Sequence, residues 1–268
     1  MNTLHWLNPS HVPQAMLLSA AAGWNQTAAD WHRLIALSPD GCFGISIDGT
    51  LAATTTVLPY GARLAWIGMV LTHPDFQRRG LATELMGHAL QYAQSHRIAC
   101  LKLDATAMGA PLYEKLGFTP ESSIQRWARS PKTTPAATQL PQGFDAAMDH
   151  AAFGVDRSAL LQLLKTEASA IIPGAGFAFG RPGANAAYFG PCVCMEEKAA
   201  RQLLQWFLNS HQEENVLWDL LPTNQYATRL AQEFGFAPAR LLTRMTRGST
   251  PLQSKTEMIY AIAGFECG

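Results

Sequence analysis

The sequence has no excess of charge of either sign. Its 268 residues include 20 Lys plus Arg and 20 Asp plus Glu, which gives a formal net charge of zero. A neutral chain has no net field with which to hold a nucleic acid or an anionic membrane by charge alone. We therefore expect neither a nucleic acid nor a membrane as a partner.

Cysteine is also scarce. Five cysteines are scattered along the chain, without the C-x-x-C spacing of a zinc site or the density of a disulfide scaffold. Cys192 and Cys194 are two residues apart, which in a strand places both side chains on one face, as buried thiols rather than metal ligands. Free thiols fit a reducing cytoplasm, and we expect no metal.

Long hydrophobic runs are missing too. No stretch reaches the roughly 20 apolar residues that a membrane helix needs, and the first residues lack a basic region followed by an apolar core. These absences predict a cytoplasmic protein. With 48% hydrophobic residues, the chain can bury one large core or two ordinary ones, and its length favours two domains.

The first half begins with helical patterns and continues with β-rich runs. We expect two short helices between residues 9 and 37, separated by the break Gly23–Gln26, with Thr27 as the N-cap of the second. The later elements of this half are predicted as an antiparallel meander at 42–47, 51–58 and 64–71, a helix at 80–96, a strand at 98–103 and a short helix at 111–116. At the other end of the chain, beyond residue 234, we expect late strands up to Phe265.

Residues 129–143 change character, because they are rich in proline and poor in large apolar residues. We interpret them as a linker between a domain at 1–128 and a second domain at 144–268. The order of elements predicted beyond the linker repeats that of the first half, with helices at 145–153, 156–164, 196–208 and 225–234 and strands at 177–179, 188–193 and 216–221.

One segment occurs twice. Residues 112–120, LYEKLGFTP, reappear at 230–238 as LAQEFGFAP, with the same chain breakers in the same places. Chance similarity between two helix-to-strand turns is the alternative explanation. The matching order of the surrounding elements favours a duplicated domain.

The segment Gln77–Ala82 has the properties of an anion site. It follows the apolar strand Trp66–Leu71 and opens a helix, where backbone N–H groups lack internal partners and the helix dipole adds partial positive charge. Gly80 and Ala82 leave room for a phosphate, and basic side chains precede them. A pyrophosphate would fit there.

In this order, the segments resemble those of the GNAT superfamily of acyl-CoA N-acyltransferases. Residues 70–82 resemble the pyrophosphate loop of that family and residues 111–118 its second cofactor segment, and with the meander the likeness covers about residues 3–127. With a degraded second copy, the chain resembles a bacterial two-domain subgroup. The resemblance implies an α/β (α+β) fold of tandem GNAT-like domains, each a mixed, mostly antiparallel sheet flanked by helices.

The resemblance also implies acetyl-CoA, or another short acyl-CoA, as cosubstrate. The backbone of residues 69–71 would pair with the pantetheine arm, and residues 78–83 would wrap the pyrophosphate. The expected cofactor-binding residues are Met69, Val70, Leu71, Gln77, Arg78, Arg79, Gly80, Leu81, Ala82 and Thr83.

Two residues are candidates for proton transfer. The resemblance places Tyr113 near the leaving thiolate, which favours it as general acid; the alternative is an aromatic packed on a helix face. Asp104, at the end of the strand predicted at 98–103, is the candidate for the base that must deprotonate the acceptor amine. A turn-forming aspartate is the alternative for Asp104.

The predicted acceptor is a small-molecule amine. Aromatic walls with a few amides would suit it, and the candidates are Trp24, Asn25, Gln26 and Tyr60. Trp66 is expected to be structural.

The second copy lacks the features of a cofactor site. Ala231 stands where the first half has Tyr113, and residues 194–199 contain two acids and no glycine. We expect a single cofactor site, with the second half completing the acceptor pocket or forming an interface such as that of a homodimer. The predicted function is direct transfer of an acyl group to an amine in a ternary complex. A non-catalytic acyl-CoA sensor is the alternative.

Overall fold

The computed structural model describes residues 2–134, 136–248 and 254–268. Pro135 of the predicted linker and residues 249–253 of the second half lie outside the described residues. Within the described part, no helix is long and apolar enough to cross a membrane.

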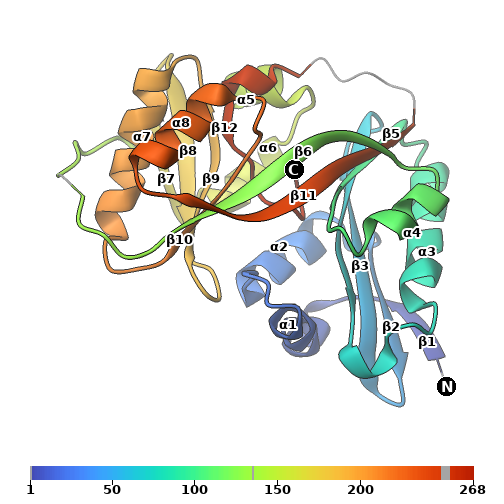
Figure 1. Cartoon of the computed structure of the whole chain (residues 1–268). Helices are drawn as coiled ribbons and strands as arrows, with labels where there is room; N and C mark the ends of the chain where they lie inside the picture. The colour runs from blue at the N-terminus through green and yellow to red at the C-terminus, as the bar shows by residue number, and fades with distance from the viewer. Residues whose placement is uncertain (1, 135, 249–253) are drawn as a thin grey trace.

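The first half contains the elements that the sequence predicts, together with additional strands at both of its ends (Figure 1). In chain order they are β1 (Asn2–Trp6), η1 (Pro9–His11), α1 (Val12–Ala21), α2 (Ala28–Leu37), β2 (Cys42–Ile47), β3 (Thr50–Tyr60), β4 (Leu64–Thr72), η2 (Pro74–Phe76), α3 (Leu81–Ser95), β5 (Cys100–Ala105), α4 (Ala110–Lys115) and β6 (Thr119–Arg129).

The second half repeats much of this order. Its elements are α5 (Ala146–Phe153), α6 (Ser158–Leu164), β7 (Ala168–Ile172), β8 (Gly176–Arg181), β9 (Ala187–Cys194), α7 (Glu197–Ser210), β10 (Val216–Leu220), α8 (Gln225–Glu233), β11 (Ala237–Gly248), η3 (Thr256–Met258) and β12 (Ile259–Ala261). Strands β1, β6 and β7 have no counterpart among the predicted elements.

Hydrogen bonds between Thr27 and Asp30 fix the start of α2. Thr27 accepts a hydrogen bond from the N–H of Asp30 at 3.4 Å, and the Asp30 carboxylate accepts from the Thr27 N–H at 2.8 Å. This reciprocal capping box confirms the expected helix start. Trp31 and Leu34 of this helix are buried in the core.

The strands of both halves form one continuous sheet, in the order β1-β2-β3-β4-β5-β11-β6-β10-β9-β8-β7. The long central strands are exchanged. β11 from the second half pairs with β5 of the first, whereas β6 from the first half pairs with β10 of the second. β6 and β11 run antiparallel to each other through the middle of the molecule (Figure 1). The predicted boundary at residue 128 therefore falls at the end of a strand that lies among strands of the second half.

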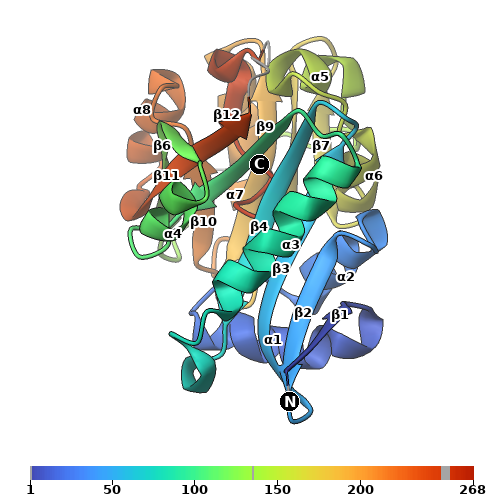
Figure 2. The same ribbon diagram turned by 90° about the vertical axis from the view of Figure 1, so that its right-hand side faces the viewer.

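Helices cover both faces of the sheet. α3 lies across β2, β3 and β4 on one face (Figure 2), with Leu85 and Ala89 buried against them. On the opposite face, one apolar core contains residues from α1 and α2 as well as from α5 and α6, including Trp31, Phe153 and Leu161. The two halves thus share a core as well as a sheet.

Candidate functional site

The site begins where β4 and β5 separate. These parallel strands pair only at Ala65 with Leu101 and Trp66 with Lys102. Beyond that point β4 is bulged. Met69 has a φ of 50°, and its carbonyl accepts a hydrogen bond from the Thr54 hydroxyl of β3 at 2.8 Å. Because the pairing stops, backbone groups of residues 69–71 face an opening instead of a neighbouring strand.

The loop after β4 lies beside this opening and presents backbone donors. Gly80 has a φ of 80° and precedes α3, whose first internal hydrogen bond runs from the Glu84 N–H to the Gly80 carbonyl at 3.0 Å. The N–H groups of residues 81–83 consequently have no partner within the helix. A Cβ added to Gly80 would meet no atom within 4 Å, so there is room for a phosphate. These features match those that the sequence predicts for an anion site.

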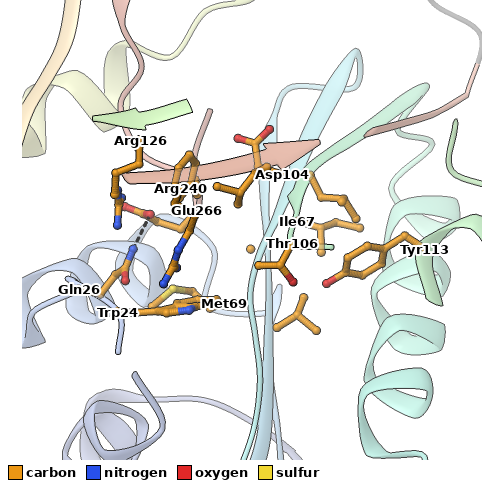
Figure 3. Close-up of a pocket in the computed structure, with 15 residues that line it drawn as sticks. Trp24, Gln26, Ile67, Met69, Asp104, Thr106, Tyr113, Arg126, Arg240 and Glu266 are labelled. Carbon is orange, nitrogen blue, oxygen red and sulfur yellow. Dashed lines mark hydrogen bonds between the residues drawn. The ribbon is translucent and has the colours of Figure 1, made fainter. Parts of the chain in front are cut away.

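A pocket of about 620 Å³, including its open mouth, occupies the space between β4 and β5 (Figure 3). Its walls come from both halves of the chain. They are formed by Trp24, Gln26, Ile67, Gly68, Met69, Val70, Leu103, Asp104, Thr106, Tyr113, Arg126, Arg240, Leu242, Phe265 and Glu266.

Tyr113 lies at one end of the pocket. α4 carries it, and its ring packs edge-on against Phe118 with centroids 6.2 Å apart. Burial raises the pKa of Tyr113 to about 12. The phenol therefore stays protonated around neutral pH and can act as a hydrogen-bond donor.

Asp104 also lines the pocket, but its charge is already paired. Both carboxylate oxygens accept hydrogen bonds from Arg244 of β11, at 2.9 and 3.0 Å. The sequence predicts Asp104 just beyond the end of a strand, whereas it lies inside β5, because pairing with β11 extends that strand to Ala105. Burial raises the pKa of Asp104, and Arg244 opposes this effect. Figure 3 shows its carboxylate turned away from Trp24 and Met69.

The segment at residues 262–268 passes directly over β4 and brings a second carboxylate to the pocket. Trp66 donates from its indole N–H to the Phe265 carbonyl at 2.9 Å. The next residue, Glu266, accepts a hydrogen bond from the Gln26 amide at 2.9 Å and meets Arg181 at 3.3 Å. Thus a residue about 200 positions from β4 contributes to the wall of its pocket.

Glu266 belongs to a buried ionic network. Arg181 meets Glu266 and, at 3.2 Å, Asp30, which in turn pairs with Arg33 at 2.7 Å. Burial is the main cause that raises the pKa of Glu266. Asp30 adds to the increase and Arg181 opposes it. A carboxylate with a raised pKa is a stronger base than an exposed one.

The four residues expected to bind the acceptor divide into two groups. Trp24 and Gln26 line the pocket. The Asn25 side chain instead bridges the two halves, donating to the Ala186 carbonyl at 2.9 Å and accepting from the N–H groups of residues 185 and 186. Tyr60 lies outside this pocket, because its hydroxyl donates to the Cys267 carbonyl at 2.6 Å and its ring packs against Phe153.

The corresponding position in the second half is filled by the chain itself. β9 and β10 pair in parallel over three residues, and β12 then pairs with β9 at Val193 and Cys192. The Ile262 N–H continues this contact by donating to the Asp219 carbonyl of β10 at 3.0 Å. Ala231, at the position aligned with Tyr113, is buried in the core of this half. The opening that β4 and β5 leave in the first half is therefore occupied in the second.

Comparison with known proteins agrees with this duplicated architecture. The sequence model described as the acetyltransferase (GNAT) family matches residues 4–118, and that described as an acetyltransferase (GNAT) domain matches residues 146–261. The chain is 30% identical over 217 residues to an uncharacterized N-acetyltransferase, YitH, of Bacillus subtilis (strain 168), covering 74% of this chain and 75% of that protein. The chain belongs to the GNAT acetyltransferase family. It is thus a tandem GNAT acetyltransferase, of a family that uses acetyl-CoA as donor.

Solved structures share the fold of this acetyltransferase. A putative acetyltransferase from Pyrococcus horikoshii superposes with a TM-score of 0.88 at 19% identity, covering 100% of this chain and 96% of that one. A GCN5-related N-acetyltransferase from Sphaerobacter thermophilus gives a TM-score of 0.66 at 18% identity, covering 95% and 98%. A tandem GNAT protein from the clavulanic acid biosynthesis pathway gives 0.64 at 16% identity, covering 94% and 99%.

Sequence reasoning missed the pocket residues supplied by β6, by β11 and by the 262–268 segment. These residues include Arg126 and Arg240, which reach the pocket through the strand exchange, and Glu266, which reaches it because the 262–268 segment crosses β4. The one local signal was Glu266 itself, a lone charge in the apolar run at residues 258–268. A buried charge in such a run is uncommon unless it is paired or functional.

Proposed function

We propose that this acetyltransferase moves an acetyl group from acetyl-CoA to the amine of a small molecule inside the pocket between β4 and β5. The donor would lie along residues 69–71, with its pyrophosphate at residues 77–83. The edge of β4 that β5 leaves unpaired and the N–H groups without partners in the first turn of α3 support this placement. The acceptor would enter at the opposite end, beside Trp24, Gln26 and Glu266.

The reaction in this proposal is a direct transfer. The neutral amine nitrogen attacks the thioester carbonyl carbon, and a C–N bond forms. Glu266 accepts the proton that the amine nitrogen loses. The C–S bond then breaks, and Tyr113 donates a hydrogen bond and a proton to the departing thiolate. No covalent bond to the enzyme is needed.

We assign the base to Glu266 rather than to Asp104. Two charge-assisted hydrogen bonds from one guanidinium hold the Asp104 carboxylate and stabilise its ionised form. Glu266 has a neutral amide at 2.9 Å and a longer contact to Arg181, which Asp30 shares. Burial raises the pKa of both carboxyls, but the Glu266 carboxylate is the less strongly held of the two.

The single observation that carries the proposal is that one cavity, between β4 and β5, is lined by both the protonated phenol of Tyr113 and the buried carboxylate of Glu266. Tyr113→Phe tests it. We expect acetyl-CoA affinity, measured by calorimetry, to stay within about twofold, and thiol release with an accepted amine to slow by roughly 10²–10⁴-fold. Tyr92→Phe, on α3 and outside the pocket, is the matched control. An unaltered rate in Tyr113→Phe would remove this residue from the mechanism.

A further inference from the structure

Arg240 is the arginine of the pocket wall whose charge has no carboxylate partner among the described residues. It is exposed, and it projects from β11 toward Trp24 and Gln26, at the end of the pocket away from Tyr113 (Figure 3). The other arginines around the site are all paired: Arg126 with Asp219 at 2.7 Å, Arg181 with Glu266 and Asp30, and Arg244 with Asp104. Arg240 therefore leaves one uncompensated positive charge at the acceptor end.

A β-bulge places this side chain. Pro238 pairs with Trp127 and Arg240 with Arg126, so that Ala239 is an extra residue in β11. Bulges reorient the side chains that follow them. Here the bulge sets Arg240 directly across from Arg126, and like charges in such a cross-strand pair are destabilising. Asp219 neutralises Arg126 from the other side, but nothing described balances Arg240.

Groups that suit an amine lie at the same end of the pocket. The Glu266 carboxylate can accept hydrogen bonds from an ammonium or amine. The side-chain oxygen of Gln26 is buried and has no hydrogen-bond partner in the described structure, whereas its nitrogen is bound to Glu266. A buried acceptor without a partner is costly, so a donor from a ligand would satisfy it. The acceptor end thus offers oxygens for an amine and a guanidinium for an anion.

We infer that the acceptor is an amine that also carries a carboxylate, with Arg240 binding the carboxylate while the amine lies against Glu266 and Gln26. This inference rests on the proposed function, because it names the substrate class of the same pocket. The planar guanidinium matches a carboxylate with two parallel hydrogen bonds, which selects for the acid over its neutral amide. An α-amino acid or a longer amino acid fits this description.

The experiment compares acceptors that share an amine and differ in charge. Each set contains an amino acid, its primary amide and the decarboxylated amine, and one further compound replaces the carboxylate by a phosphate. Thiol release gives kcat/KM for each. We expect the wild-type enzyme to prefer the acid over its amide by about 10–100-fold, as a charge-assisted contact provides. In Arg240→Ala this ratio should approach one, and in Arg240→Glu it should invert. Arg247→Ala, on the same strand but outside the pocket, should keep the wild-type ratio.

The outcomes separate this inference from the proposed function. If acetyl-CoA does not bind, or no amine is acetylated, the proposed function itself is wrong. If amines are acetylated but the acid-to-amide ratio is near one, or is unchanged in Arg240→Ala, the inference is overturned while the function stands. Weaker acetyl-CoA binding in Arg240→Ala would show that Arg240 binds the donor. A preference for the phosphate compound would show that the anionic group of the acceptor is a phosphate and not a carboxylate. Each result also overturns the inference.

Discussion

Replacing Gly68 by alanine should disturb both stability and catalysis, because the 262–268 segment crosses β4 at this glycine. A Cβ added to Gly68 would stand 2.7 Å from the Glu266 Cα and 2.9 Å from its carbonyl oxygen, whereas ordinary contacts begin at 3.4 Å. The obstructing atoms are backbone, so the segment must move by roughly 1 Å. Overpacking of this kind costs about 1–3 kcal/mol. At about 2–4 °C per kcal/mol for a domain of this size, thermal unfolding should shift down by roughly 2–12 °C.

The same displacement carries Glu266 with it. A reacting group misplaced by about 1 Å can lower the rate by about 100-fold. We therefore expect Gly68→Ala to lower kcat by more than the loss of folded protein can explain. The kcat is measured by thiol release at a temperature where the variant is folded. Gly87→Ala is the matched control, because a Cβ at this position of α3 meets no atom within 4 Å and alanine favours a helix. A Gly68→Ala enzyme with wild-type unfolding temperature and kcat would refute the described path of the segment over β4.

Two further variants examine the carboxylates of the pocket. Glu266→Gln should slow the chemical step and flatten its pH dependence. The wild-type base works only when it is ionised, so the wild-type rate should rise with pH through the pKa of Glu266, which burial raises. A variant with the wild-type pH profile would exclude Glu266 as the base. Asp104→Asn should instead lower the free energy of unfolding by about 3–5 kcal/mol, since it leaves the buried Arg244 without a counter-charge, with little loss of kcat in the folded enzyme. Wild-type stability with abolished turnover in Asp104→Asn would return the base role to Asp104.

Local signals in the sequence were sufficient for much of the first half. Thr27 as a helix cap, the three-stranded meander and the helix after Gly80 depend on contacts between residues close in the chain, which periodicity and turn chemistry reveal. The tandem GNAT fold was implied by a resemblance to that family, which these segments carry, and it is confirmed by the family matches to both halves.

The exchange of β6 and β11 could not be predicted in this way. Either strand could pair within its own half, and the hydrophobic pattern of a strand does not specify which neighbour it has. The ion pair between Asp104 and Arg244 exists only because β11 lies beside β5, and this is why an aspartate that resembles a catalytic base in sequence is held by an arginine 140 residues away. Tyr60 illustrates the same limit, since its partner Cys267 is 207 residues distant.

The most direct test of this account is the stoichiometry of acetyl-CoA binding, measured by calorimetry on the wild-type protein and on Gly80→Glu. β4 and β5 leave an opening beside the loop at residues 77–83, whereas β12 occupies the equivalent place in the second half. We predict one acetyl-CoA per chain, and no binding in Gly80→Glu, where a bulky acid would stand at the phosphate position with an unfavourable φ. Two molecules per chain, or undiminished binding in Gly80→Glu, would contradict the assignment of a single site to the first half.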